Sequence, residues 1–162
     1  MIELRDITFE NVNRVLNLKI KFSQRKFVLK PADTIAMAYA GINEGCPGFA
    51  NAIYYNDMPV GLILIGQAPV ADYEPEILRK YEYVYRVVGF LIDEYYQNCG
   101  IGRRALSLAL EKVKDYPLGN KTVVTLECHE KNEKALEFYK SFGFTYIGKT
   151  NDHNYILVRL TE

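Results

Sequence analysis

The sequence contains little of what marks a secreted, disulfide-bonded or metal-binding protein. It has no tryptophan and only three cysteines, Cys46, Cys99 and Cys128. An odd number of cysteines at such wide spacing fits neither a disulfide framework nor a metal-ligand motif. We therefore expect reduced cysteines, no bound metal and a cytoplasmic protein.

The sequence also lacks an excess of one charge and a long apolar run. Lysine plus arginine number 20, as do aspartate plus glutamate, so no global charge attracts nucleic acid or an anionic membrane. No apolar run approaches the roughly 20 residues that a helix needs to cross a bilayer. Charged residues near Met1 interrupt the apolar core of a secretory signal. We expect no nucleic-acid partner and no membrane partner.

What is present fits one mixed α/β domain. The chain of 162 residues is long enough to bury a proper core, and we expect residues 1–162 to form a single domain. Hydrophobic periodicity predicts the element order βααβββαβαββ, with a long loop at 67–80. The strands are expected at 2–7, 50–55, 60–66, 83–92, 122–128, 144–148 and 155–160, and the helices at 11–21, 34–41, 102–115 and 132–142.

Two glycines, Gly100 and Gly102, stand where the fourth expected strand gives way to a helix. Glycine lets the backbone approach a ligand closely, and the first amides of a helix have no intrahelical partner. Together with the helix dipole, these amides suit a phosphate group. The alternative is a glycine turn that only begins a helix, and these residues alone do not distinguish the two.

Two nucleotide-binding motifs fit this loop poorly. A P-loop has lysine and Ser/Thr after its last glycine, whereas Arg103 and Arg104 follow here. The segment Gly100–Ala105 does satisfy the dinucleotide pattern G-x-G-x-x-A, with Glu127 as the ribose-binding acid. That motif places its first glycine directly after the strand, whereas residues 93–99 intervene in this sequence.

A second segment, 132–144, points to another family. Asn132 and Tyr139 lie two helical turns apart and share a face. This segment fits N-x-x-A-x-x-[LF]-Y-x-x-x-G-F, and Gln97–Gly102 fits Q/R-x-x-G-x-G/A, with a strand between the two motifs. On these motifs and on its element order, the chain resembles the GCN5-related N-acetyltransferase (GNAT) superfamily across nearly its whole length.

The resemblance implies a GNAT-like domain, in which a mixed, mostly antiparallel sheet has a splayed strand pair and flanking helices. It implies acetyl-CoA (CoA) as co-substrate in the wedge between the splayed strands. Tyr139 would protonate the departing thiolate, which a well-placed phenol of pKa about 10 can do. The residues implied to hold acetyl-CoA are the backbone of Phe90, Leu91 and Ile92, the loop Gln97, Asn98, Cys99, Gly100, Ile101, Gly102 and Arg103, and the side chains of Thr125 and Asn132.

Structural explanations exist for both helical residues. Asn132 begins its helix and could serve only as an N-cap. Tyr139 lies on the apolar face of the same helix and could be a core tyrosine whose hydroxyl is hydrogen-bonded. The glycine loop favours the functional interpretation of both residues, and a capping residue can also bind a ligand.

The general base has no clear position. Polyamine acetylases of this superfamily carry an acid on the strand that contacts acetyl-CoA, where this sequence has Val88. Glu82 has the same strand parity but lies roughly 20 Å away at about 3.3 Å per residue. Glu127 could substitute, although an ion pair would also explain it, and a water chain could carry the proton.

The acceptor is expected to be a small amine. Acids and aromatics at 72–76 and 81–83 suit a cationic amine, although a solvated acidic loop would look the same. The pattern around 60–66 and 90–97 resembles bacterial spermine/spermidine (diamine) acetyltransferases, although Val88 and Gly89 depart from it. We expect direct acetyl transfer to a primary amine, preferably a polyamine such as spermidine or spermine. A protein/peptide N-acetyltransferase and a non-catalytic acyl-CoA-binding module are the alternatives, and the edge at 144–160 could serve a homodimer.

Overall fold

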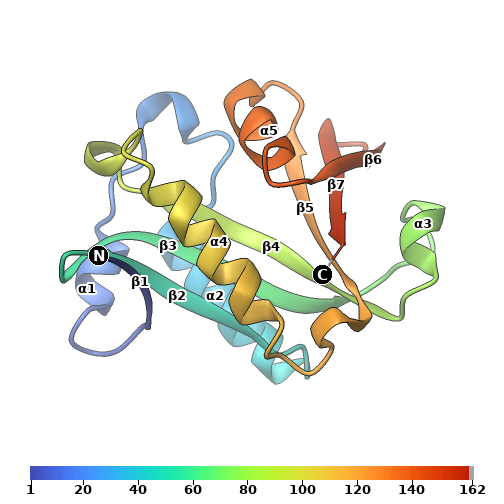
Figure 1. The fold of residues 1–162 in the computed structure, drawn as a ribbon, viewed down its shortest axis with the longest axis horizontal. Coiled ribbons are helices and arrows are strands. Elements are labelled where there is room, and N and C mark those ends of the chain that lie inside the picture. Colours follow the sequence, from blue (N-terminus) through green and yellow to red (C-terminus); the bar gives the residue numbers. More distant parts are fainter. Residues whose placement is uncertain (161–162) are drawn as a thin grey trace.

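Seven strands form one sheet in the order β1-β2-β3-β4-β5-β7-β6 in the computed structural model, which describes residues 1–160 (Figure 1). Neighbouring strands are antiparallel, except that β4 and β5 are parallel. The predicted mixed, mostly antiparallel sheet is confirmed. The strands are β1 (Ile2–Asp6), β2 (Gly48–Tyr55), β3 (Met58–Pro69), β4 (Tyr83–Ile92), β5 (Val123–His129), β6 (Thr145–Lys149) and β7 (Asn154–Leu160).

Helices cover both faces of this sheet. In Figure 1, α4 crosses the front face diagonally with α5 near it, whereas α2 lies behind the sheet. The buried side chains of α4 recur at three- and four-residue steps, as the sequence predicts. Within residues 1–160, no helix is both long and apolar enough to span a bilayer. The helices are α1 (Val12–Leu16), α2 (Pro31–Asn43), α3 (Glu76–Arg79), α4 (Ile101–Val113) and α5 (Glu133–Lys140), with 3-10 turns η1 (Phe22–Gln24), η2 (Glu94–Tyr96) and η3 (Gly119–Lys121).

The first helix is shorter than predicted: α1 ends at Leu16, whereas the prediction continues it to residue 21. Tertiary hydrogen bonds occupy the main chain that would have continued it. The Lys19 amide donates to the Asp93 carboxylate at 2.8 Å, and the Lys19 carbonyl accepts from the Glu94 amide at 2.9 Å. These partners lie far away in the sequence, so helical periodicity alone overestimates the length of α1.

The expected loop at 67–80 contains more regular structure than predicted. Strand β3 continues to Pro69 because its last residues pair with the start of β4. The short helix α3, which is absent from the predicted order, follows Pro75 and buries Leu78 completely. Two adjacent apolar residues, Ile77 and Leu78, in a four-residue helix give no helical periodicity, so the burial of Leu78 that stabilises α3 is visible only in the fold.

Residues with positive φ form the turn between β2 and β3 and the turn after α5. The hairpin between β2 and β3 has a two-residue loop in which Asn56 and Asp57 have φ of 48° and 65°. Positive φ at both positions identifies a type I′ turn, whose twist matches that of the flanking strands. Gly143 has φ of 81° after α5, the left-handed conformation that commonly ends a helix.

The parallel strands β4 and β5 separate partway along their length. They pair only over Tyr85–Val87 and Val124–Leu126. At the point of separation, the register of β4 against β3 shifts and leaves Val88 without a partner on β3. Such a bulge bends its strand and increases the local twist. The predicted splayed strand pair is therefore present, with a wedge between 88–92 of β4 and 127–129 of β5.

Gly89, directly after the bulge, allows α2 to pack closely against β4. A Cβ at this position would lie 2.8 Å from both Oγ1 and Cγ2 of Thr34, whose side chain is buried. We expect Gly89→Ala to lower the free energy of unfolding by about 1–3 kcal/mol through overpacking, measured by urea denaturation. Gly66→Ala is the matched control, since its Cβ would meet nothing within 4 Å. Equal stability of the two variants would contradict the close packing.

Candidate active site

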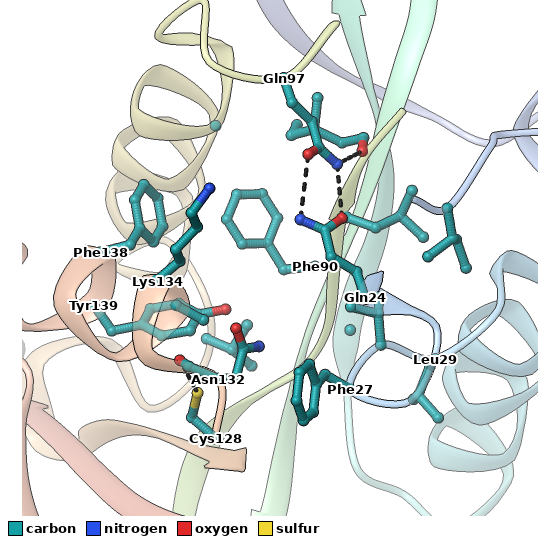
Figure 2. Close-up of a pocket in the computed structure, with 18 of the residues that line it drawn as sticks. Gln24, Phe27, Leu29, Phe90, Gln97, Cys128, Asn132, Lys134, Phe138 and Tyr139 are labelled. Atoms are coloured by element: carbon teal, nitrogen blue, oxygen red, sulfur yellow. Dashed lines mark hydrogen bonds between the residues drawn. The ribbon is translucent and has the colours of Figure 1, made fainter. Parts of the chain in front are cut away.

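A cavity of about 560 Å³ lies in the wedge between β4 and β5, within the size range of small-molecule sites. Four parts of the chain form its walls: the open half of β4, the loop before α4, the end of β5 with α5, and the segment between α1 and α2 (Figure 2). The side chains labelled in Figure 2 are Gln24, Phe27, Leu29, Phe90, Gln97, Cys128, Asn132, Lys134, Phe138 and Tyr139.

The glycine loop, residues 97–103, presents unpaired main-chain amides at the N-terminus of α4. Asn98 and Gly100 have φ of 62° and 77°, which turn the chain sharply into the helix. Within residues 1–160, no group accepts a hydrogen bond from the amides of 98–103. With the positive end of the helix dipole behind them, these amides form a site suited to an anion.

The open half of β4 directs the main chain of alternate residues into the wedge. The Asp93 amide donates to a β3 carbonyl at 2.8 Å. Antiparallel alternation therefore points the main chain of Leu91 toward β3, and that of Phe90 and Ile92 toward the wedge. The Leu91 side chain is buried against the α1 side of the sheet. Phe90 and Ile92, rather than Leu91, can thus offer main-chain groups to a ligand.

Asn132 and Tyr139 project from α5 into the cavity (Figure 2). Asn132 occupies the N-cap position, but its side chain makes no capping hydrogen bond. The Tyr139 ring packs edge-on against Phe138 and Phe144, with centroid distances of 5.4 and 5.8 Å. Burial raises the pKa of the Tyr139 phenol, and the nearby Cys128 thiol raises it further. Within residues 1–160, no group forms a hydrogen bond with the Asn132 side-chain amide or the Tyr139 hydroxyl, so both remain available to a ligand.

Three of the expected residues lie outside the cavity lining. Thr125 is fully buried and donates its hydroxyl to the Tyr85 carbonyl at 3.3 Å, where β4 and β5 are still paired. The Ile101 side chain belongs to the core beneath α4, and Cys99 is exposed. Thr125 therefore joins β5 to β4 below the wedge. Ile101 and Cys99 contribute only their main-chain amides to the glycine loop.

Glu127 is the only carboxylate among residues 1–160 that lines the cavity. It accepts a hydrogen bond from the Asn154 amide group at 3.2 Å, so the expected ion pair is replaced by a neutral partner. His129 also lines the cavity, but its Nδ1 accepts from the Lys131 amide at 3.1 Å. The neutral His129 ring therefore carries its proton on Nε2. Glu82 is exposed and does not reach the cavity.

The acidic and aromatic segments 72–76 and 81–83 do not line this cavity. Glu74 instead binds Arg86, whose Nη2 lies 2.6 and 2.7 Å from the two carboxylate oxygens. The Ala71 amide donates to the same carboxylate at 2.8 Å. Glu74 therefore neutralises a cation of β4 and stabilises its own loop.

The segment between α1 and α2 forms a wall of the cavity that was not predicted. Phe27 and Leu29 line the cavity opposite α5 (Figure 2). Phe27 packs against His129 with ring centroids 5.2 Å apart. No motif marks these residues, since the contacts that place them come from the far half of the chain.

Cys128 lies on the floor of the cavity and was also not expected there. Its thiol is buried, and burial raises the pKa of Cys128 to about 11. A thiol with such a raised pKa remains protonated near neutral pH.

Residues 1–160 contain no group of three or more His, Cys, Asp or Glu side chains placed to hold a metal ion.

Comparison with known proteins identifies one family and a shared fold. The model of the Acetyltransferase (GNAT) family matches residues 16–144. Arabidopsis thaliana Naa50 in complex with the bisubstrate analogue CoA-Ac-MVNAL is similar, with 20% identity, a TM-score of 0.66 and coverage of 98% of this chain and 97% of that chain. The ribosomal-protein-S18-alanine N-acetyltransferase from Escherichia coli has 14% identity, a TM-score of 0.67 and coverage of 100% and 95%. PaiA N-acetyltransferase from Thermoplasma acidophilum in complex with coenzyme A has 15% identity, a TM-score of 0.66 and coverage of 99% of both chains.

Proposed function

Since this chain belongs to the acetyltransferase (GNAT) family, we propose that it transfers the acetyl group of acetyl-CoA directly to a primary amine. The observation that supports this most is the meeting of three features in one wedge. These are the unpaired amides of the glycine loop, the open edge of β4, and the free side chains of Asn132 and Tyr139. The proposal treats residues 1–162 as one catalytic domain, with β6 as the edge strand available for a homodimer.

The wedge fits each part of acetyl-CoA. The amides of 98–103 and the positive charge of Arg103 suit the diphosphate. The main chain of Phe90 and the amide of Ile92, whose carbonyl already accepts from Gln97, would pair with the amide groups of the pantetheine arm, as an added strand would. A Cβ at Gly102 would lie 3.6 Å from Ile92 and 3.8 Å from Phe90, and would fill the floor of this cradle.

Direct transfer agrees with the chemistry of the cavity. Acetyl-CoA supplies the thioester, and the chain positions the two substrates and moves protons. Cys128 is a poor nucleophile because its pKa of about 11 keeps the thiol protonated, so an acetyl-cysteine step is disfavoured. Val88, which has no partner on β3, lies beside the cavity, where a main-chain amide can stabilise the carbonyl oxygen.

Proton transfer is assigned to Glu127 and Tyr139. Glu127 would accept the proton that the amine loses, since it lines the cavity and one of its oxygens accepts no hydrogen bond within residues 1–160. Tyr139 would donate a proton to the departing sulfur, and its raised pKa keeps the phenol protonated at all physiological pH values.

Two acceptor classes follow from different observations. A polyamine is the first candidate on the sequence resemblance around 60–66 and 90–97 alone, since the acidic segments at 72–76 and 81–83 lie outside the cavity lining and Glu74 is bound by Arg86. A peptide amino terminus is the second candidate, because the similar fold of Naa50 was solved with a peptide-containing bisubstrate analogue. The apolar wall formed by Phe27 and Leu29 suits the side chain of a peptide better than a polycation.

The proposal is tested by calorimetry with CoA, followed by a free-thiol release assay with acetyl-CoA. We expect one CoA site per chain and turnover on at least one of spermidine, spermine, short diamines and peptides with a free amino terminus. The preferred acceptor is the one with the highest kcat/KM. CoA binding without turnover on any amine would favour a binding module, and absence of CoA binding would reject the proposal.

Tyr139→Phe removes the proposed acid while keeping the packing against Phe138 and Phe144. We expect kcat to fall about 100-fold or more, with CoA affinity changed less than about twofold. Because its pKa is raised, Tyr139 should cause no loss of wild-type rate as the pH rises through 10, the ordinary value for tyrosine. Tyr146→Phe, at an exposed tyrosine outside the cavity, is the matched control. A Tyr139→Phe enzyme with the wild-type rate would remove this residue from the mechanism.

Glu127→Gln removes the proposed base but retains the ability to accept from Asn154. We expect kcat/KM at pH 7 to fall about 100-fold. At this pH most of the amine is protonated, and the variant lacks the carboxylate that would accept its proton. The loss should shrink as the pH rises and free amine becomes abundant, measured as a pH–rate profile. Glu130→Gln, whose carboxylate already binds Lys149 outside the cavity, serves as the control. A Glu127→Gln enzyme with the wild-type pH–rate profile would remove Glu127 from the mechanism and point to water as the proton acceptor.

A further inference from the structure

Residues 19–30, which we call the strap, connect α1 to α2 and bridge the wedge. At one end, the Lys19 amide donates to the buried Asp93 carboxylate at 2.8 Å, just past the end of β4. At the other end, the Phe27 ring packs 5.2 Å from the His129 ring at the end of β5. The strap thus contacts both of the strands that form the wedge.

A reciprocal amide pair holds the middle of the strap to the glycine loop (Figure 2). Gln24 Nε2 donates to Gln97 Oε1 at 3.2 Å, and Gln97 Nε2 donates to Gln24 Oε1 at 2.8 Å. Gln97 Nε2 also donates to the Ile92 carbonyl at 2.9 Å, which secures the pair to the end of β4. Gln97 is the first residue of the loop whose amides are proposed to hold the diphosphate.

Few other polar contacts hold the tip of the strap. Ile20 and Val28 pack against the core cluster near α1 and so anchor its base. Phe22, by contrast, is 82% exposed. The strap contains no acid, and within residues 1–160 none of its cations forms an ion pair. Those cations are Lys19, Lys21, Arg25, Lys26 and Lys30.

The strap borders the side of the cavity where the amine would enter. Glu127 and His129 lie two residues apart on β5 and therefore share a face of that strand. Phe27 packs on His129, which places the strap beside the proposed base. The position of the strap therefore affects the shape of the acceptor side.

We propose that Gln24 is a positioning residue that couples the glycine loop to this acceptor wall. Occupation of the loop by CoA holds Gln97 in place, and Gln97 in turn holds Gln24 and closes the strap. Coupling of this kind is reciprocal, so a closed strap also favours CoA. The inference rests on the proposed function, since CoA is the ligand that would occupy the loop.

Hydrogen–deuterium exchange with and without CoA tests the coupling. In the wild-type chain, we expect CoA to slow amide exchange in both 97–103 and 20–28. In Gln24→Ala, CoA should still slow exchange at 97–103, whereas strap exchange should be about fivefold to thirtyfold faster than in the CoA-bound wild type, the effect of losing two neutral hydrogen bonds. With the best acceptor of the amine panel, its KM should rise about fivefold while kcat changes less than about twofold.

Ser23→Ala is the matched control, because Ser23 is an exposed strap residue whose side chain makes no hydrogen bond within residues 1–160. It should retain wild-type exchange and KM. CoA protection of 97–103 without protection of 20–28 in the wild-type chain would overturn this inference alone. Equal strap protection by CoA in wild type and Gln24→Ala would also overturn it. Failure of CoA to bind the wild-type chain would overturn it together with the proposed function.

Discussion

Main-chain hydrogen bonds between β4 and β5 stop after Val87, and the organisation of the site follows from that loss. A strand edge inside a protein must find other partners for its amides and carbonyls. At the end of β4, the Gln97 side chain occupies the Ile92 carbonyl, while the main chain of Phe90 still faces the wedge. The sheet therefore keeps an opening in its middle, where a linear molecule with amide groups can replace the missing strand.

Polar groups around the wedge divide into those already satisfied and those left free. Thr125 bonds the Tyr85 carbonyl and Glu74 bonds Arg86, so these groups maintain the structure beside the opening. Within residues 1–160, the side-chain polar groups of Asn132 and Tyr139 have no hydrogen-bond partner. Main-chain amides, a side-chain amide and a phenol are thus available around one cavity, whereas no buried side-chain nitrogen or oxygen within residues 1–160 lacks a partner. This contrast supports a binding site more strongly than the presence of any one residue.

Local signals predicted many parts of the fold correctly. The strands that flank Asn56 and Asp57 and the buried stripe of α4 depend on residues close in sequence. Predictions failed where distant partners intervene. Helix α1 stops early because the Lys19 main chain bonds 93–94, and β3 lengthens because β4 pairs with it.

The sequence by itself determined the family, the order of the main elements and the two motifs, because glycine conformation and helical spacing are local properties. It also placed Asn132 and Tyr139 on one helical face, which the structure turns into the cavity. Only the tertiary structure decided that Thr125 lies below the wedge, that Glu127 lines it, and that Gln24 meets Gln97. These outcomes depend on where two strands separate and on which segments, far apart in the sequence, then come into contact. No local pattern of residues encodes such long-range contacts.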